Sequence, residues 1–177
     1  MTQEKWLRGA AAGLLATVPM TVAMVIAHRL LPARQRYPVP PRLITERWLD
    51  RDHSEPAIRA WTLINHFGFG AVAGSLYSGL GFDKRKPAVA GPAFGIAVWT
   101  ASYLGWVPAL GLMPPATRQP AERNAMMIGA HFVWGAALAG AAVLLSPPKS
   151  SPRPRPSRIR DELGEQTGGG PHSRWRA

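Results

Sequence analysis

The sequence of 177 residues contains no cysteine. That absence excludes disulfides, thiolate nucleophiles, cysteine-ligated zinc, iron–sulfur clusters and covalently attached c-type haem. Acidic residues are also few, with 10 Asp and Glu against 21 Lys and Arg, and the formal net charge is +11. Nucleic-acid binding would explain such a charge. Here, however, the basic residues flank apolar stretches, which is typical of membrane-protein loops that contact anionic lipid headgroups. We therefore expect no nucleic-acid partner.

Charge is missing altogether from four long stretches of the chain. No Asp, Glu, Lys or Arg occurs in residues 9–28, 60–82, 87–117 and 124–148. A soluble helix keeps a polar face, whereas about 20 apolar residues cross the ~30 Å hydrocarbon core of a bilayer. The sequence therefore predicts an all-α integral membrane protein, a four-helix bundle. Its spans are expected at about residues 9–31, 57–82, 88–113 and 124–145.

Two segments outside these spans have their own character. Residues 41–51 place apolar side chains on one side of a short helix, which predicts a helix in the membrane interface with Trp48 at headgroup level. A helix packed on the rim of the bundle explains the same pattern. Residues 147–177 are rich in Pro, Ser, Arg and Gly, and we expect a disordered basic tail after a transmembrane domain of residues 1–146. This tail and the basic turn at residues 84–86 favour cytoplasmic positions for both termini.

The first span contains a proline in its middle. Pro19 has no backbone N–H and is expected to kink the helix, because it removes one hydrogen bond of the helical ladder. The hydroxyls of Thr17 and Thr21 are candidates to satisfy the freed carbonyl groups.

An internal similarity connects the two halves of the chain. Residues 66–71 read His-Phe-Gly-Phe-Gly-Ala and residues 131–136 read His-Phe-Val-Trp-Gly-Ala, while residues 9–13 and 91–95 both read Gly-x-x-x-Gly. The pattern predicts two similar helical hairpins in the same orientation. Coincidence in a chain rich in Ala and Gly is the alternative. Small residues at this spacing allow helices to approach closely within a membrane.

The two histidines of this similarity, His66 and His131, are the candidate site residues. Each lies six or seven residues inside its expected span, about 10 Å along the axis, and ionisable groups at such depth are functional candidates. Three hypotheses remain open. The pair forms neutral hydrogen bonds between the hairpins, titrates to sense or relay protons, or provides axial ligands to a b-type haem with Gly70 and Gly135 leaving room.

Catalysis has no candidate residues in the sequence. No carboxylate lies inside an expected span, so paired acid–base catalysis within the membrane is not supported. Residues 68–74 are glycine-rich like a dinucleotide-binding loop, but they lie inside an apolar run without a preceding strand, and helix packing explains them better. We therefore expect no enzymatic activity, no metal site and, in the leading hypothesis, no cofactor.

Several strings in order also carry a family resemblance. They are residues 40–49, residues 86–95 at the start of the third span, Leu-Gly-Leu-Met-Pro-Pro at 110–115 and Gly-Ala-His-Phe-Val-Trp at 129–134. Through them the chain resembles, over about residues 5–146, the YagU-type family of small bacterial inner-membrane proteins. The resemblance implies a multi-pass protein of the bacterial plasma membrane without a defined enzymatic activity, linked in one lineage to acid resistance.

These observations give a leading hypothesis and two alternatives. The leading one is a non-enzymatic inner-membrane protein that supports envelope or acid-stress tolerance. Its expected partners are the lipid bilayer and either a second copy of the chain or a membrane partner subunit. The alternatives are a haem-binding electron-transfer subunit that uses His66 and His131, and a small transporter.

Overall fold

The computed structural model describes residues 2–36, 40–49 and 54–147. Contacts divide the chain into two units, Met1–Ser146 and Pro147–Ala177, and every helix described below belongs to the first. The expected tail lies, from residue 148 onward, outside the described residues. The last two positions of the expected interfacial helix, residues 50 and 51, also lie outside them.

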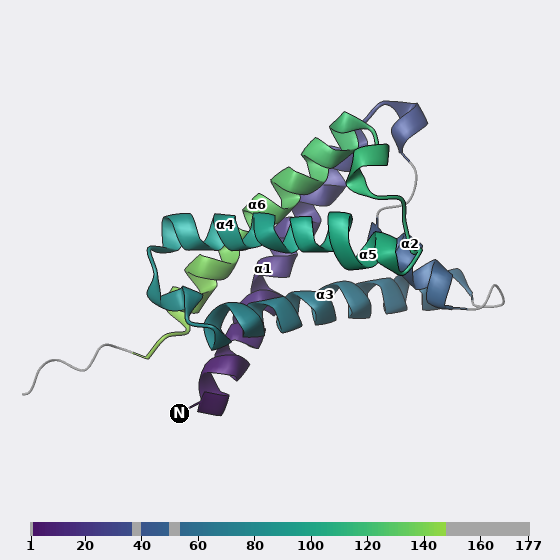
Figure 1. Ribbon diagram of the computed structural model, residues 1–177. Helices are drawn as coiled ribbons and strands as arrows, with labels where there is room; N and C mark the ends of the chain where they lie inside the picture. Colours follow the sequence, from purple (N-terminus) through teal and green to yellow (C-terminus); the bar gives the residue numbers. More distant parts are fainter. Residues whose placement is uncertain (1, 37–39, 50–53, 148–177) are drawn as a thin grey trace, which may run out of the picture. The chain divides into compact units, whose positions relative to one another are not determined.

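The described part of the chain is helical and contains no strand, which confirms the all-α prediction (Figure 1). In chain order the elements are α1 (Thr2–Leu30), η1 (Ala33–Gln35), α2 (Pro40–Trp48), α3 (Glu55–Gly79), η2 (Phe82–Lys84), α4 (Pro87–Thr100), η3 (Ala101–Trp106), α5 (Val107–Ala109), η4 (Ala116–Arg118) and α6 (Ala121–Leu144).

Three helical segments are long and apolar enough to cross a membrane. They are Gln3–Leu30, Pro87–Ala109 and Ala121–Leu144. Four spans were predicted, and the helix missing from this set is α3, the expected second span. Its first half carries Glu55, Arg59 and Asn65, and its second half is built largely of Gly, Ala and Ser. These small residues add little hydropathy, although they leave the stretch free of charge.

Two glycines end helices earlier than the sequence suggested. α3 ends at Gly79, three residues before the expected end, because Gly81 adopts a left-handed φ of 82° and a short 3-10 turn follows. The third expected span stops at Ala109 rather than at residue 113, just before Gly111 with a φ of 67°. Glycine reaches these angles at no steric cost, so both positions act as helix stops.

Pro19 lies inside α1, which continues as one helix on both sides of it. The Thr17 hydroxyl donates to the Gly13 carbonyl at 2.8 Å, and the Thr21 hydroxyl donates to the Thr17 carbonyl at 2.7 Å. The carbonyl that Pro19 deprives of its partner is that of Leu15, four residues earlier. The expectation that the two threonines satisfy that freed carbonyl was therefore wrong.

α1 and α3 approach each other closely through glycines. A Cβ atom placed on Gly9 would overlap the Gly74 carbonyl oxygen, and one placed on Gly13 would overlap the Gly70 carbonyl oxygen. Only glycine fits where two helix backbones touch in this way. Thr62, His66, Gly70, Gly74 and Ser78 recur every four residues on α3. The last three are buried, whereas Thr62 and His66 are half-buried.

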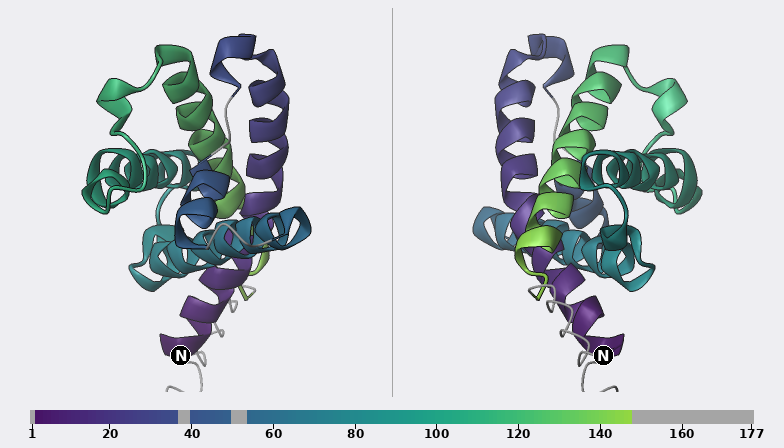
Figure 2. Two further views of the ribbon diagram at one scale, coloured as in Figure 1. Left: turned by 90° about the vertical axis from the view of Figure 1, so that its right-hand side faces the viewer. Right: turned by 90° about the vertical axis from the view of Figure 1, so that its left-hand side faces the viewer.

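α4 and α6 repeat the same type of contact. A Cβ atom on Gly91 would overlap the Gly135 carbonyl oxygen, and one on Gly95 would overlap the His131 carbonyl oxygen. The similarity between the two halves of the sequence is thus matched by similar packing. Where the halves meet, α1 contacts α6, and α3 and α4 cross these two helices obliquely (Figures 1 and 2). A four-helix bundle of aligned hairpins is therefore not confirmed in that form.

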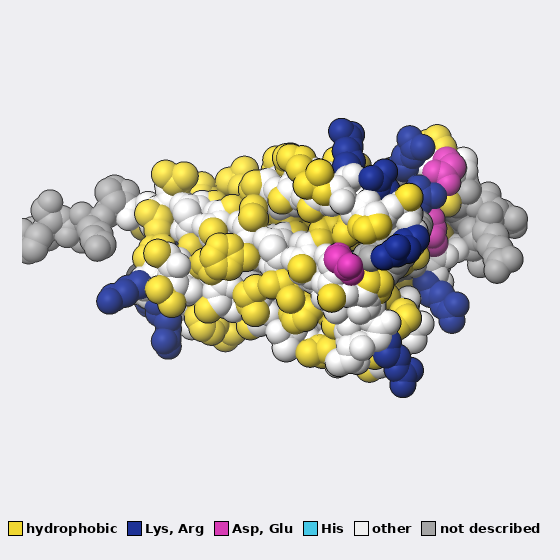
Figure 3. Space-filling model, turned by 90° about the horizontal axis from the view of Figure 1, so that it is seen from above, with side chains coloured by type: hydrophobic (Ala, Val, Ile, Leu, Met, Phe, Trp, Pro, Cys, Tyr) yellow, Lys and Arg dark blue, Asp and Glu magenta, His cyan; other side chains and the backbone are white. Residues whose placement is uncertain are grey.

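The surface of this unit is apolar over its middle. Leu14, Leu15 and Val18 of α1 are exposed, and Phe132 of α6 is 53% exposed, as expected for a lipid-facing residue. On the face in Figure 3, the charged side chains gather towards the two ends and leave a broad apolar band between them. Soluble monomers rarely expose such large apolar patches, so this surface is compatible with a membrane protein.

The short helix α2 packs against α3. Thr45 is fully buried and accepts a hydrogen bond from Asn65 of α3 at 3.2 Å. Arg42 pairs with Glu46 at 2.6 Å and with Glu55 of α3 at 2.7 Å, and these hydrogen bonds raise the pKa of the Arg42 guanidinium. Trp48 is 72% exposed. The helix therefore combines rim packing with an exposed aromatic end.

Candidate functional site

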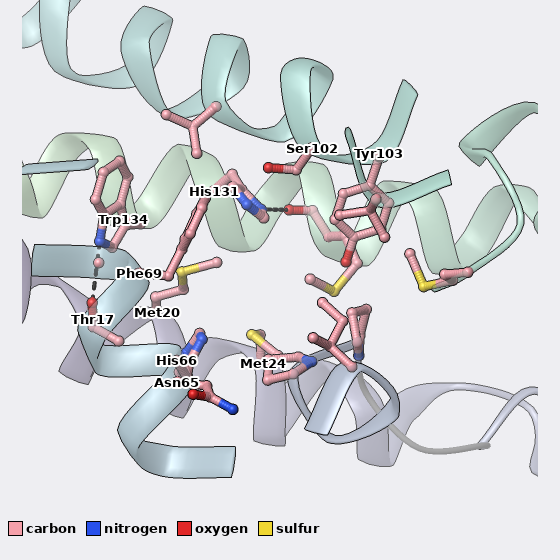
Figure 4. Close-up of a pocket in the computed structure, with 18 of the residues that line it drawn as sticks. Thr17, Met20, Met24, Asn65, His66, Phe69, Ser102, Tyr103, His131 and Trp134 are labelled. Carbon is pink, nitrogen blue, oxygen red and sulfur yellow. Dashed lines mark hydrogen bonds between the residues drawn. The ribbon is translucent and has the colours of Figure 1, made fainter. Parts of the chain in front are cut away.

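A cavity of about 180 Å³ lies among the helices of the first unit (Figure 4). It is lined by side chains from α1, α2, α3, η3, α5 and α6. Val98 of α4 and Met113, which lies between α5 and η4, complete the lining. Most of these side chains are apolar, five are polar, namely Thr17, Asn65, His66, Ser102 and His131, and no carboxylate is among them. A mainly apolar lining with a few polar groups is the usual character of a small-molecule site.

Both histidines singled out from the sequence line this one cavity. His66 reaches it from α3 and His131 from α6, and Figure 4 shows them on opposite sides. The two histidines are 65 positions apart in the sequence. Both line the cavity because α3 and α6 each contribute to its wall. The sequence-based expectation that they share one depth is consistent with this placement.

His131 is held in one tautomer. Its ring is buried, with 6% exposure, and its Nδ1 lies 2.8 Å from the Met127 carbonyl oxygen. A carbonyl only accepts, so Nδ1 carries the hydrogen and, in the neutral ring, Nε2 keeps its lone pair. This hydrogen bond stays within α6, so it does not link the two halves of the protein. Any hydrogen-bond partner of Nε2 must therefore be a donor.

The hydrogen bonding of the His66 ring differs from that of His131. Its Nε2 is buried and has no hydrogen-bond partner within residues 2–36, 40–49 and 54–147, while the ring meets the edge of Phe67 at 6.0 Å between centroids. Leaving a buried polar group unpaired costs about 1–3 kcal/mol. A ligand or a water molecule that bonds this nitrogen would remove that cost.

The direct link between the two halves comes from other residues. The Trp134 indole N–H of α6 donates to the Thr17 hydroxyl of α1 at 3.3 Å, in the wall of the cavity. Sequence reasoning placed Thr17 next to Pro19 but did not pair it with α6. A tryptophan and a threonine 117 positions apart give no local signal that could have predicted this contact.

A π-helical turn forms part of the cavity wall. Residues Ala101–Trp106 form η3, which brings Ser102 and Tyr103 to the cavity with little exposure. The Trp106 indole N–H donates to the Ser102 hydroxyl at 3.2 Å. Single π-turns occur frequently at functional sites. The sequence analysis missed this turn, although Pro108 was a usable signal, because proline cannot donate to the Leu104 carbonyl and disturbs the regular helical ladder.

Aromatic and methionine side chains complete the lining. The Tyr103 ring meets His131 edge-on with 6.1 Å between centroids, and Phe69 lies 5.9 Å from Trp106. Four methionines also face the space, namely Met20, Met24, Met113 and Met127. Methionine is flexible and polarisable, so such a wall can adapt to the shape of a ligand.

A second pocket of about 450 Å³ adjoins the central cavity. Met24, Pro41 and His66 line both spaces. The outer pocket also includes Arg29 and Arg36, which lie near the ends of helices where the charged residues gather. It thus lies between the charged end of the unit and the histidine-lined space, against the side chains that the two spaces share.

The arrangement can bind a small molecule, but it lacks the parts needed for several other chemistries. Within the described residues no group of three or more His, Cys, Asp or Glu could hold a metal ion.

Comparisons with protein-family models, with curated proteins and with solved structures found no match for this chain. The function is therefore inferred from the geometry and from the sequence.

Proposed function

We propose that this chain is a multi-pass protein of the bacterial inner membrane, without enzymatic activity, that supports tolerance of envelope or acid stress. The observation that carries the proposal is the placement of His66 and His131 on one cavity among apolar helices, with no carboxylate in its lining. A neutral imidazole becomes charged when it takes up a proton, so such a pair is suited to respond to acid. The resemblance to the YagU-type family supports the same role.

In this proposal α3 is the fourth span. Its glycines pack directly on those of α1, and its residues 60–79 contain no formal charge. A helix of lower hydropathy can lie in a membrane when its polar and small residues face neighbouring helices. Both termini then lie in the cytoplasm, the bilayer is the main partner, and a second copy or another membrane subunit covers part of the exposed surface.

Survival at low pH tests the physiological part of the proposal. A strain that lacks this chain is compared with its parent and with a strain that carries His66→Ala together with His131→Ala. We expect both altered strains to survive acid challenge less well than the parent, with equal growth at neutral pH. A Phe132→Ala strain is the control, because this side chain points away from the cavity. Equal survival of the parent and the double variant would reject the role of the histidines.

Haem binding is a second candidate with one specific observation in its favour. The Nδ1 of His131 bonds the Met127 carbonyl, and this type of bond orients histidines that ligate a metal through Nε2. The cavity of about 180 Å³ is, however, smaller than the roughly 300–1,000 Å³ of sites for drug-sized ligands. A reduced-minus-oxidised spectrum of protein purified after haem supplementation tests it. An unchanged α-band and Soret region would eliminate haem.

A further inference from the structure

We propose that the central cavity binds a small neutral molecule consisting of one six-membered aromatic ring with a hydroxyl group, as found in phenols and in the headgroup of membrane quinols. The proposal rests on the histidine-lined cavity of the proposed function, but it does not depend on a role in acid tolerance. It assigns a ligand class to a space that the acid-tolerance hypothesis leaves without an occupant.

The size of the cavity selects a single ring. An engineered apolar cavity of about 150 Å³ is known to hold benzene, and the cavity here measures about 180 Å³. It is therefore large enough for one ring with one or two small substituents and too small for a fused-ring system without rearrangement of its walls.

The walls suit a flat aromatic molecule. Phe69, Tyr103 and Trp106 present aromatic groups from α3 and η3, and aromatic pairs prefer the offset and edge-on arrangements that such a lining permits. Met20 and Met127 add flexible, polarisable side chains, which pack well against ring edges. These contacts would hold an apolar ring but would not orient it.

The histidines supply the orientation. His131 donates through Nδ1 to Met127, so its neutral ring accepts a hydrogen bond at Nε2 and therefore requires a donor such as a hydroxyl. His66 has a buried Nε2 without a partner among the described residues, and it lies on the opposite side of the cavity. A second hydroxyl group on the ring would offer a partner to this nitrogen as well. A quinone oxygen only accepts, so it does not match neutral His131.

The adjoining outer pocket gives the ring a way in and provides space for a substituent. Met24, Pro41 and His66 line both spaces and therefore lie at the boundary between them. Beyond them the outer pocket is apolar at Val25 and Leu63 and basic at Arg29, Arg36 and Arg42. An alkyl chain attached to the ring could therefore extend past these side chains, as the tail of a membrane quinol would require.

The test uses the full chain in nanodiscs and two fluorinated probes of nearly equal size. 4-Fluorophenol carries the hydroxyl, and 4-fluorotoluene replaces it with a methyl group. Their dissociation constants are measured by 19F NMR titration, with empty nanodiscs to subtract partition into lipid. One additional hydrogen bond in a desolvated site predicts about five- to tenfold tighter binding of the phenol.

Variants assign this preference to His131. His131→Leu should bind both probes equally, and His131→Gln, which restores an acceptor, should regain part of the preference for the phenol. Phe132→Leu is the matched control on the exposed face and should bind like the wild type. Helical content and monodispersity are checked for each variant. Equal binding of the two probes by the wild type overturns the proposal, as does the absence of binding above empty nanodiscs. A preference that persists in His131→Leu also overturns it.

A competition experiment distinguishes the two sources of the ligand. Displacement of bound 4-fluorophenol by 2-decyl-1,4-benzenediol at concentrations at which phenol itself fails would identify a quinol headgroup. Displacement by phenol but not by the alkylated diol would identify a free phenol. Failure of both would contradict the proposed site, whereas the outcome of the acid-survival experiment bears only on the physiological role.

Discussion

The indole N–H of Trp134 on α6 bonds the hydroxyl of Thr17 on α1 at 3.3 Å, across 117 positions of the sequence. The same hydroxyl donates its hydrogen to the Gly13 carbonyl at 2.8 Å, and its oxygen therefore acts as the acceptor for the indole N–H. α1 and α6 are the helices through which the two halves of the protein meet, and this bond lies in the wall of the cavity. It therefore ties the shape of the cavity to the contact between the halves.

Thr17→Val should weaken this contact. Valine keeps the shape of threonine but leaves the buried Trp134 N–H without an acceptor, which predicts a loss of about 1–2 kcal/mol in the free energy of unfolding. Reversible unfolding in mixed micelles of SDS and a mild detergent measures it. Thr100→Val is the control, because Thr100 bonds its own helix in the same way at 2.9 Å but is exposed. Equal losses in the two variants would contradict the role of the Trp134 bond.

Gly13→Ala should destabilise the contact between α1 and α3. The added Cβ would overlap the Gly70 carbonyl oxygen, and overpacking of this kind typically costs about 1–3 kcal/mol. Gly68→Ala provides the comparison, since nothing lies within 4 Å of a Cβ at that position. It should be neutral or slightly stabilising, because alanine is the better helix former. Thermal denaturation in detergent of both variants would show the difference.

Glu55→Gln should loosen α2 from α3 by less than about 1 kcal/mol, because the ion pair with Arg42 is partly exposed and screened by salt. Hydrogen bonds with Glu46 and Glu55 raise the pKa of Arg42 above its ordinary value. The contribution of the guanidinium is thus fully present below the ordinary pKa and is lost only as pH rises through the raised one. We expect the variant and the wild type to converge in 0.5 M NaCl when unfolding is followed at neutral pH. A difference unaffected by salt would argue against the ion pair.

Single introduced cysteines should reveal the orientation in the membrane. The chain has no cysteine of its own, so a membrane-impermeant maleimide reports each introduced thiol separately. Arg34→Cys, after α1, is expected to react in intact spheroplasts. Arg85→Cys, between α3 and α4, is expected to react only after permeabilisation, because four spans with cytoplasmic termini place these two exposed residues on opposite sides. Labelling of both from the same side would refute the proposed four-span topology.

Much of the fold could be predicted from the sequence because membrane helices have a simple signature. Loss of charge over long stretches indicated where the long helices lie, although α1 begins at Thr2, seven residues before the expected first span. The Gly-x-x-x-Gly motifs pointed to the close contacts that Gly9, Gly13, Gly91 and Gly95 make. The depth of His66 and His131 indicated that both are near the centre. These features depend on local composition and spacing, which a single sequence contains.

The remainder depends on long-range geometry. The oblique crossing of α3 and α4 over α1 and α6 follows from how side chains interlock across helices, and no local pattern records it. The π-turn at Ala101–Trp106 places Ser102 and Tyr103 on the cavity, yet regular helical periodicity predicts different faces for them. Four spans were expected, whereas α3 has too few strongly apolar residues to qualify by composition. The contacts of α3 with neighbouring helices, rather than its own hydropathy, determine its position.

The glycine contacts also restrict how this molecule can move. Where the carbonyl of Gly74 occupies the position that a side chain at Gly9 would need, neither helix can rotate about its own axis without a collision. α4 and α6 are locked in the same manner through Gly91 and Gly135. Rotation within either pair is therefore opposed by the helix backbones themselves. The contact between the two pairs rests instead on side chains, such as Trp134 against Thr17 and Phe69 against Trp106.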